Sequence, residues 1–138
     1  MRTFLLSVAT SLLLVVPLSA QMTGGGPSNM MSTEILAPAA GRGPGAEGAL
    51  WRTDLWLKSA TGSTVTLEFH PNDSTTDAAA ATAQVAMTSP VTYLQDVLKN
   101  NFGLDQAFGN IVIRGTKAVS ATLRVYTTTG VGSYGSAF

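Results

Sequence analysis

The sequence contains no cysteine among its 138 residues. That absence excludes disulfide bonds, thiolate metal sites, a cysteine nucleophile and a thioether-linked lipid anchor. Charge is also scarce, because only 12% of the residues are charged and eight basic side chains balance eight acidic ones. A nearly neutral chain does not attract nucleic acid or anionic membranes, so we expect neither as a partner. The fold must be held by its hydrophobic core alone, which is feasible at this length.

Histidine is nearly absent too, since His70 is the only one. A single histidine cannot form a two-histidine zinc site, and no G-x-S-x-G elbow supplies a serine nucleophile. A small secreted hydrolase that brings Ser133 or Ser136 beside His70 through the fold stays open as an alternative. The sequence itself predicts no catalytic residue.

Two weak motifs could suggest a ligand. Gly43, Gly45 and Gly48 satisfy G-x-G-x-x-G, but a dinucleotide site needs a strand before this pattern and a helix after it. Here a strand follows, so we interpret the glycines as a turn and expect no cofactor. Asp73 and Asp77 could offer oxygen ligands to calcium, yet their spacing matches no EF-hand loop. We therefore predict a hydrophilic turn there and no metal site.

The first 20 residues have the pattern of a secretory signal peptide. A basic start at Arg2 precedes a short apolar run, and small residues lead to a cleavage site near Ala20. The apolar run ends at Pro17 and is too short to span a membrane comfortably. We expect a secreted chain, periplasmic, cell-surface or extracellular, with a flexible leader over residues 21–31 and one domain over residues 32–138.

The stretch Leu50–Lys58 organises the domain because its side chains alternate. Successive side chains of a strand point to opposite faces, so we predict a half-buried strand. The inner face would hold Trp51, Thr53, Leu55 and Leu57. The outer face would hold Arg52, Asp54, Trp56 and Lys58, with Arg52 and Asp54 near enough to pair.

The rest of the domain reads as short strands joined by turns. Expected strands cover residues 34–38, 64–70, 83–88, 107–114 and 119–126, with a weak last strand near the C-terminus. Thr92 and Gln95 have the spacing of a capping box, and Leu94, Val97 and Leu98 follow at helical spacing. We therefore predict a short helix over residues 93–102. The predicted fold class is all-β, an antiparallel β-sandwich that is immunoglobulin-like in general architecture.

The chain resembles a family of secreted bacterial β-sandwich modules. The resemblance lies in residues 35–46 (ILAPAAGRGPGA) and residues 51–57 (WRTDLWL), which match an "IPA…PGA.G..WRTDLWL" signature, and in Phe69-His70-Pro71 and residues 121–127 (ATLRVYT). It covers roughly residues 35–138. Two local departures, at Lys58-Ser59 and at Thr127, affect only turn geometry. The family is functionally uncharacterised, so the resemblance implies a β-sandwich and an exported location but no catalytic residues.

Trp56 is the best candidate for a binding residue. If Trp51 points inward, Trp56 points outward with Arg52 and Asp54, and an exposed indole can stack on a sugar or anchor a partner protein. The alternative that stays open, and that the sequence favours, is that the helix or a loop covers Trp56 or that both faces of the sheet are buried. Tyr126 is a weaker candidate of the same kind. We expect a non-catalytic exported protein with a structural, adhesion or assembly role, and partners that are proteins or glycans at the cell surface. A carbohydrate-binding module is the first alternative.

Overall fold

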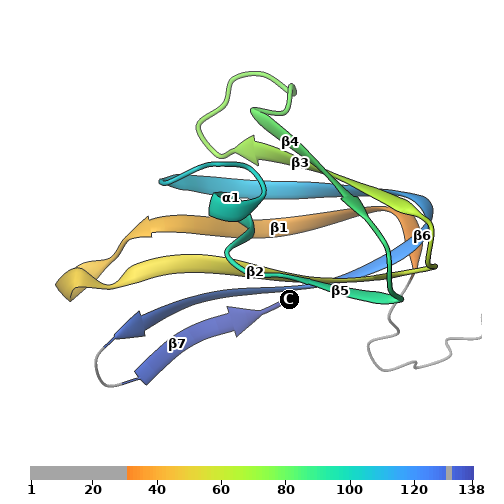
Figure 1. Ribbon diagram of the computed structural model, residues 1–138. Helices are drawn as coiled ribbons and strands as arrows, with labels where there is room; N and C mark the ends of the chain where they lie inside the picture. Colours follow the sequence, from red (N-terminus) through yellow and green to blue (C-terminus); the bar gives the residue numbers. More distant parts are fainter. Residues whose placement is uncertain (1–30, 130–131) are drawn as a thin grey trace, which may run out of the picture.

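A computed structural model describes residues 31–129 and 132–138. Within these ranges, seven antiparallel strands form one sheet, accompanied by a short helix and a 3₁₀ turn (Figure 1). The elements are β1 (Ser32–Pro44), η1 (Ala46–Gly48), β2 (Leu50–Ser59), β3 (Thr64–Pro71), β4 (Ala81–Ala86), β5 (Val91–Leu94), α1 (Val97–Asn100), β6 (Ala107–Thr129) and β7 (Gly132–Ala137). None of the described helices is long and apolar enough to cross a membrane. The predicted signal peptide lies outside the described residues, as does the predicted leader except for Met31.

The long strand β6 organises the sheet. Its N-terminal half pairs with β1 and β3, and its C-terminal half pairs with β2 and β7. Between the halves the strand bends back, so the two halves run in opposite directions in Figure 1. Gly115 lies at this bend, where a methyl group would collide with the carbonyl oxygen of Lys117. The bend therefore needs glycine, and it curls the single sheet into a half-barrel.

The core lies inside this curl and receives side chains from both halves of β6 and their partner strands. Leu55 and Leu57 of β2 alternate with more polar neighbours, as do Leu67 and Phe69 of β3. Alternation at period two is what a half-buried strand requires. The buried cluster comprises Ala37, Ala40, Leu55, Leu57, Val65, Leu67, Phe69, Val85, Met87, Val97, Leu98, Ile111, Ile113, Val119 and Leu123.

The prediction of a mostly β, antiparallel fold is confirmed. The finer prediction of two stacked sheets is not, because all seven described strands belong to one hydrogen-bonded sheet. The strands expected over residues 107–114 and 119–126 are a single element, β6. The expected turn at Gly115 lies within this element, between a stretch paired up to Gly115 and one paired again from Val119, and the register with β1 shifts there.

The first strand is longer than predicted. We expected it to end at Pro38 and a loop to follow, but β1 continues to Pro44. The register with β6 shifts between Ala37 and Ala40. Such an irregularity accommodates a proline, which has no N–H to donate to the ladder. Further along β1, the Thr53 hydroxyl accepts a hydrogen bond from the Gly41 N–H and donates one to the Gly41 carbonyl, both at 2.8 Å.

The predicted helix over residues 93–102 is only partly correct. Val91–Leu94 form β5, which pairs with β2, and the helix α1 is confined to Val97–Asn100. The expected capping box does not start it: Asp96 is the N-cap residue, in a left-handed conformation with φ of 44° and no side-chain cap hydrogen bond. Pairing with the exposed edge of β2 satisfies more backbone groups than one extra helical turn, so the strand prevails over the local pattern.

Candidate functional site

The predicted binding residues come together on the face of β2 that lies opposite Leu55 and Leu57. On the neighbouring strands, Trp56 is paired with Tyr93 of β5, Asp54 with Arg124 of β6, and Arg52 with Tyr126 of β6. Paired residues point to the same side of a sheet, so these side chains share one surface. We call Asp54, Trp56, Tyr93, Arg124 and Tyr126 the Asp54 cluster.

Asp54 is the centre of the cluster and is only 3% exposed, which corrects the prediction that it faces solvent. Its Oδ2 accepts a hydrogen bond of 2.7 Å from the Tyr93 hydroxyl. Its Oδ1 accepts one of 2.8 Å from the backbone N–H of Asp96 and a longer one of 3.4 Å from the Tyr126 hydroxyl. A buried carboxylate is costly unless it is hydrogen-bonded, and these three donors satisfy that need.

The Asp54 carboxylate helps to raise the pKa of both tyrosines. The hydrogen bond to Asp54, followed by burial and the charge of Asp54, raises the pKa of Tyr93 from 10.0 to about 12. Burial, followed by the charge of Asp54 and the hydrogen bond to it, raises the pKa of Tyr126. Ionising either phenol would remove a donor from Asp54 and place a second negative charge beside it. Both tyrosines therefore stay neutral donors at physiological pH.

The rings form a supported aromatic surface. Trp56 stacks on Tyr93 with 4.8 Å between ring centroids and 27° between planes. The guanidinium of Arg124 lies 4.7 Å from the centroid of Tyr126, within cation–π range. Tyr93 is 48% exposed and Tyr126 only 8%. A shallow hollow of about 150 Å³ lies beside Trp56, between Val91 and Thr122. The cluster thus presents one accessible ring pair on a fixed base.

Arg52 does not pair with Asp54 as predicted. No ion pair between the two is found among the described residues, and the Nε atom of Arg52 is buried without a hydrogen-bond partner. Asp54 instead takes its donors from β5, β6 and the start of α1.

Sequence reasoning missed Tyr93 and Arg124 as members of the cluster. The sequence predicts a helix that begins at Tyr93, and it predicts a strand over residues 119–126 without indicating which residue lies opposite Arg124. Residues 91–94 form a strand that pairs with β2, and this pairing sets Tyr93 directly opposite Trp56. A prediction of that strand would therefore have found Tyr93. Nothing local in the sequence marks Asp54 as buried.

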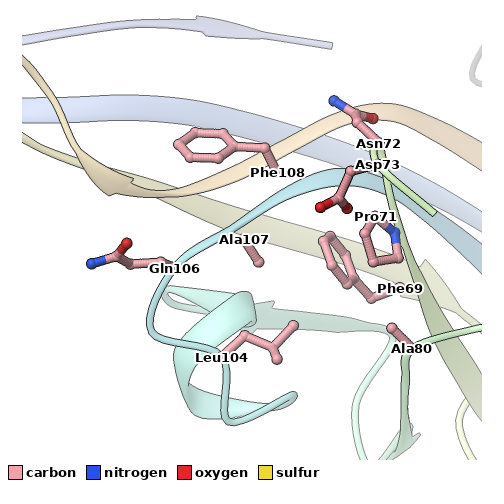
Figure 2. Close-up of a pocket in the computed structure, with 9 residues that line it drawn as sticks. All are labelled: Phe69, Pro71, Asn72, Asp73, Ala80, Leu104, Gln106, Ala107 and Phe108. Atoms are coloured by element: carbon pink, nitrogen blue, oxygen red, sulfur yellow. The ribbon is translucent and has the colours of Figure 1, made fainter.

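A second concave surface lies at one end of the core and was not predicted (Figure 2). This pocket has a volume of about 470 Å³. Apolar side chains dominate its wall, with Asn72, Asp73 and Gln106 as the polar exceptions. It is lined by Phe69, Pro71, Asn72, Asp73, Ala80, Leu104, Gln106, Ala107 and Phe108. We call it the Phe108 pocket.

The other residues weighed from the sequence are spread apart. Asp73 lines the Phe108 pocket, whereas Asp77 lines a separate hollow with His70. No group of three potential metal-binding side chains occurs in the described parts of the chain. His70 is paired with Asn110 in the N-terminal half of β6, while Ser133 and Ser136 lie on β7 beside the C-terminal half. The fold does not bring the serines of the hydrolase alternative to His70.

Comparison with protein-family models, with curated proteins and with solved structures finds no match to this chain.

Proposed function

We propose that the protein is an exported, non-catalytic β protein with a structural, adhesion or assembly role at the cell surface or outside the cell. The observation that carries the proposal is the stacked Trp56–Tyr93 pair on the Asp54 cluster. In this proposal, the ring pair is the anchor that a partner protein contacts. The signal-peptide pattern of residues 1–20 supports export, and the resemblance to secreted bacterial modules supports a place at the cell surface.

The ring pair suits a binding role because it is fixed before any partner arrives. Aromatic side chains dominate binding hot spots, since they bury a large area with few rotatable bonds. The Tyr93 hydroxyl is held by Asp54, and Asp54 is itself held by the backbone N–H of Asp96. A partner would therefore lose little affinity to ordering these rings.

A carbohydrate-binding role is the second candidate, and the same ring pair favours it. Sugar rings stack on exposed aromatic faces, and Tyr93 is exposed over about half of its surface. The hollow beside Trp56 adds the hydroxyl groups of Ser120 and Thr122 as hydrogen-bonding groups. A glycan at the cell surface would also fit an adhesion role.

The resemblance extends the proposal to fold and family. We propose that the chain belongs to the secreted bacterial β-sandwich modules and that its curled sheet is a form of their sandwich. The support is that the buried cluster draws on both halves of β6, as two facing sheets would draw on two inner faces.

The experiment that tests the function is a surface-retention assay. The mature chain, from residue 21 on, would be labelled and added to intact cells of the producing organism, and the retained fraction measured. We expect Trp56→Ala and Tyr93→Ala to lower retention severalfold. Lys117→Ala is the matched control, because Lys117 is exposed on the bend of β6 and away from the cluster. Equal retention of all variants would overturn the proposal.

A glycan panel separates the two candidates. Trp51→Phe leaves Trp56 as the only tryptophan, so its fluorescence reports binding at the ring pair. A saturable shift with a sugar, lost in Tyr93→Ala, would favour the carbohydrate role. No shift with any sugar, together with retention that protease treatment of the cells abolishes, would favour a protein partner.

A further inference from the structure

β7 is the one strand of the described sheet in which every residue is exposed. Tyr134 is 60% exposed, and Phe138, which directly follows the strand, is 61% exposed. Among the described residues β7 pairs only with β6, so its other edge is open (Figure 1). Large apolar side chains that stay exposed together mark interaction surfaces. β7 therefore presents an open edge and two uncovered rings.

The backbone of β7 has hydrogen-bonding groups that point away from β6. Leu123 of β6 and Phe138 exchange two backbone hydrogen bonds, at 2.9 and 2.8 Å. In an antiparallel pair, residues bonded in this way alternate with residues whose N–H and C=O groups point outward. The outward groups of β7 therefore belong to Ser133, Gly135 and Ala137. Such a row of groups is a template on which another strand can pair.

The side chains of β7 are complementary in size about Gly135. Two β7 strands that pair antiparallel about this residue set Tyr134 opposite Ser136 of the second copy. The same pairing sets Phe138 opposite Gly132. Each ring then faces a small residue, so the two strands fit together without a clash between large side chains.

A recess for one of these rings lies beside Ser136. It has a volume of about 250 Å³, and Trp51 and Val125 are among the residues that line it. Ser136 is paired with Val125 of β6, so their side chains lie on the same side of the sheet. Tyr134 of the second copy, which faces Ser136, would have this apolar recess within reach. Aromatic anchors in such recesses carry much of the binding energy of an interface.

A second copy suits this edge because no residue from 125 to 138 is charged. A charged partner would lose hydration there without meeting an opposite charge, whereas a second β7 is itself uncharged. The strand also lacks the features that prevent self-pairing at natural edges. It has no lysine, no proline and no bulge in its register with β6.

The other open edges of the described sheet, β4 and β5, are less suited to a second copy. On β4 the exposed side chains are Thr82, Gln84 and Ala86, none of which is a large apolar group. At β5 the Ser89 hydroxyl donates a hydrogen bond to the Val91 carbonyl. Fewer backbone groups therefore remain there for a partner strand.

We propose that two copies of the chain associate through their β7 strands, which pair antiparallel about Gly135. The pairing joins the two Gly135 residues to each other and each Ser133 to Ala137 of the other copy, so the outward backbone groups of both strands are satisfied. The contact is small, so the dimer forms and dissociates with concentration. The inference goes beyond the proposed function, since Trp56 and Tyr93 lie on β2 and β5 and take no part in it.

The parent chain tests the register without any substitution. The mature chain, from residue 21 on, would be studied by sedimentation equilibrium and by amide hydrogen exchange followed by NMR. We expect a dimer whose fraction rises with concentration. As it forms, the N–H groups of Ser133, Gly135 and Ala137 should gain at least about tenfold protection. Those of Tyr134 and Ser136, which already bond to β6, should change less.

Charge substitutions test the contact between the copies. Tyr134→Lys/Ser136→Lys sets lysine opposite lysine in the pair, and Tyr134→Glu/Ser136→Glu sets glutamate opposite glutamate. Each variant alone should dimerise at least about tenfold more weakly than the parent, because like charges directly opposite repel. An equimolar mixture of the two should form a mixed dimer. Thr82→Lys/Gln84→Lys is the matched control, because it adds two charges to the edge strand β4, and it should dimerise like the parent. Circular dichroism verifies that each variant is folded.

Each contrary outcome is distinct. A parent chain that stays monomeric at every concentration would overturn the proposal. So would protection that does not alternate along β7, or lysine and glutamate variants that dimerise as the parent does or fail to associate when mixed. Loss of the dimer in the β4 variant alone would assign the contact to β4 and would equally overturn the proposal. None of these measurements involves Trp56 or Tyr93, so this proposal and the proposed function can fail separately.

Discussion

Asp54 and Asp73 both carry carboxylates beside aromatic rings, but the Asp54 carboxylate is buried and the Asp73 carboxylate is exposed. Asp54 is almost fully buried and accepts hydrogen bonds from Tyr93, Tyr126 and the backbone of Asp96. Asp73 is exposed on the β3–β4 connection and has no ion-pair partner among the described residues. Asp54 therefore links several elements of the fold, whereas Asp73 remains in contact with water at the surface.

The difference follows from the cost of burying charge. A carboxylate removed from water needs several donors to offset the lost hydration. Asp54 obtains them from three elements, so it ties β5, β6 and the start of α1 to the central strand. Asp73 remains hydrated and therefore contributes little to folding. The residue that looked like a surface charge in the sequence is the structural one.

The largest effect is expected from Asp54→Ala. This change leaves two phenol groups and the Asp96 N–H without their acceptor, and it should lower the free energy of unfolding by about 3 kcal/mol. Urea denaturation followed by circular dichroism measures it. A loss below about 1 kcal/mol would show that Asp54 is not the anchor described here.

Arg42→Ala should have the next largest effect. The Nε atom of Arg42 donates to both carboxylate oxygens of Asp96, at 3.2 and 3.1 Å, and Nη1 donates to the Asp105 carbonyl. Losing these partly buried, charge-assisted bonds should cost about 2 kcal/mol in unfolding free energy. Arg114→Ala is the matched control. Its ion pairs with Glu34 and Glu68 are more exposed and screened by solvent, so a clearly smaller loss than in Arg42→Ala is expected.

Tyr93→Phe tests a single bond of the cluster. It removes the hydroxyl that donates to Asp54 but keeps the ring that stacks on Trp56, so the expected loss is about 1 kcal/mol. Thermal unfolding of the variant and the parent gives the comparison. A variant as stable as the parent would mean that water replaces the hydroxyl without cost.

Asp73→Asn should have the smallest effect. An exposed loop acid without a partner is expected to change the free energy of unfolding by no more than about 0.5 kcal/mol. The same denaturation series detects it. A large loss of stability would contradict the contrast with Asp54.

Much of the sheet could be predicted from the sequence, because alternation is a local signal. The inward positions of Leu55, Leu57, Leu67 and Phe69 follow from period-two spacing alone, and all four are buried. The length of β1 could not be predicted the same way. Pro38 indicated an end to the strand, but a register shift against β6 accommodates it, and that shift depends on residues far away in the chain.

The candidate sites show the same limit. Trp56 and Tyr126 were identified from alternation, but Tyr93 was not, because Thr92 and Gln95 mimic the start of a helix. Residues 91–94 form a strand because they pair with the open edge of β2. That edge lies far away in the sequence, so the local pattern does not reveal the pairing. The position of the Phe108 ring depends on Gly41 and Gly43, which lie under it and are more than 60 residues away in the chain. The sequence shows both glycines, but it does not show that Phe108 lies over them.

The most direct test of the Asp54 anchor is the alkaline titration of Tyr93. Its pKa is raised in the folded chain from 10.0 to about 12. Its contribution to stability is therefore intact below pH 10 and declines as the pH rises from 10 through about 12. Tyrosinate absorbance of the parent minus that of Tyr93→Phe isolates this group, and circular dichroism verifies that both chains remain folded. The account predicts a midpoint near 12, whereas a midpoint near 10 in the folded protein would contradict it.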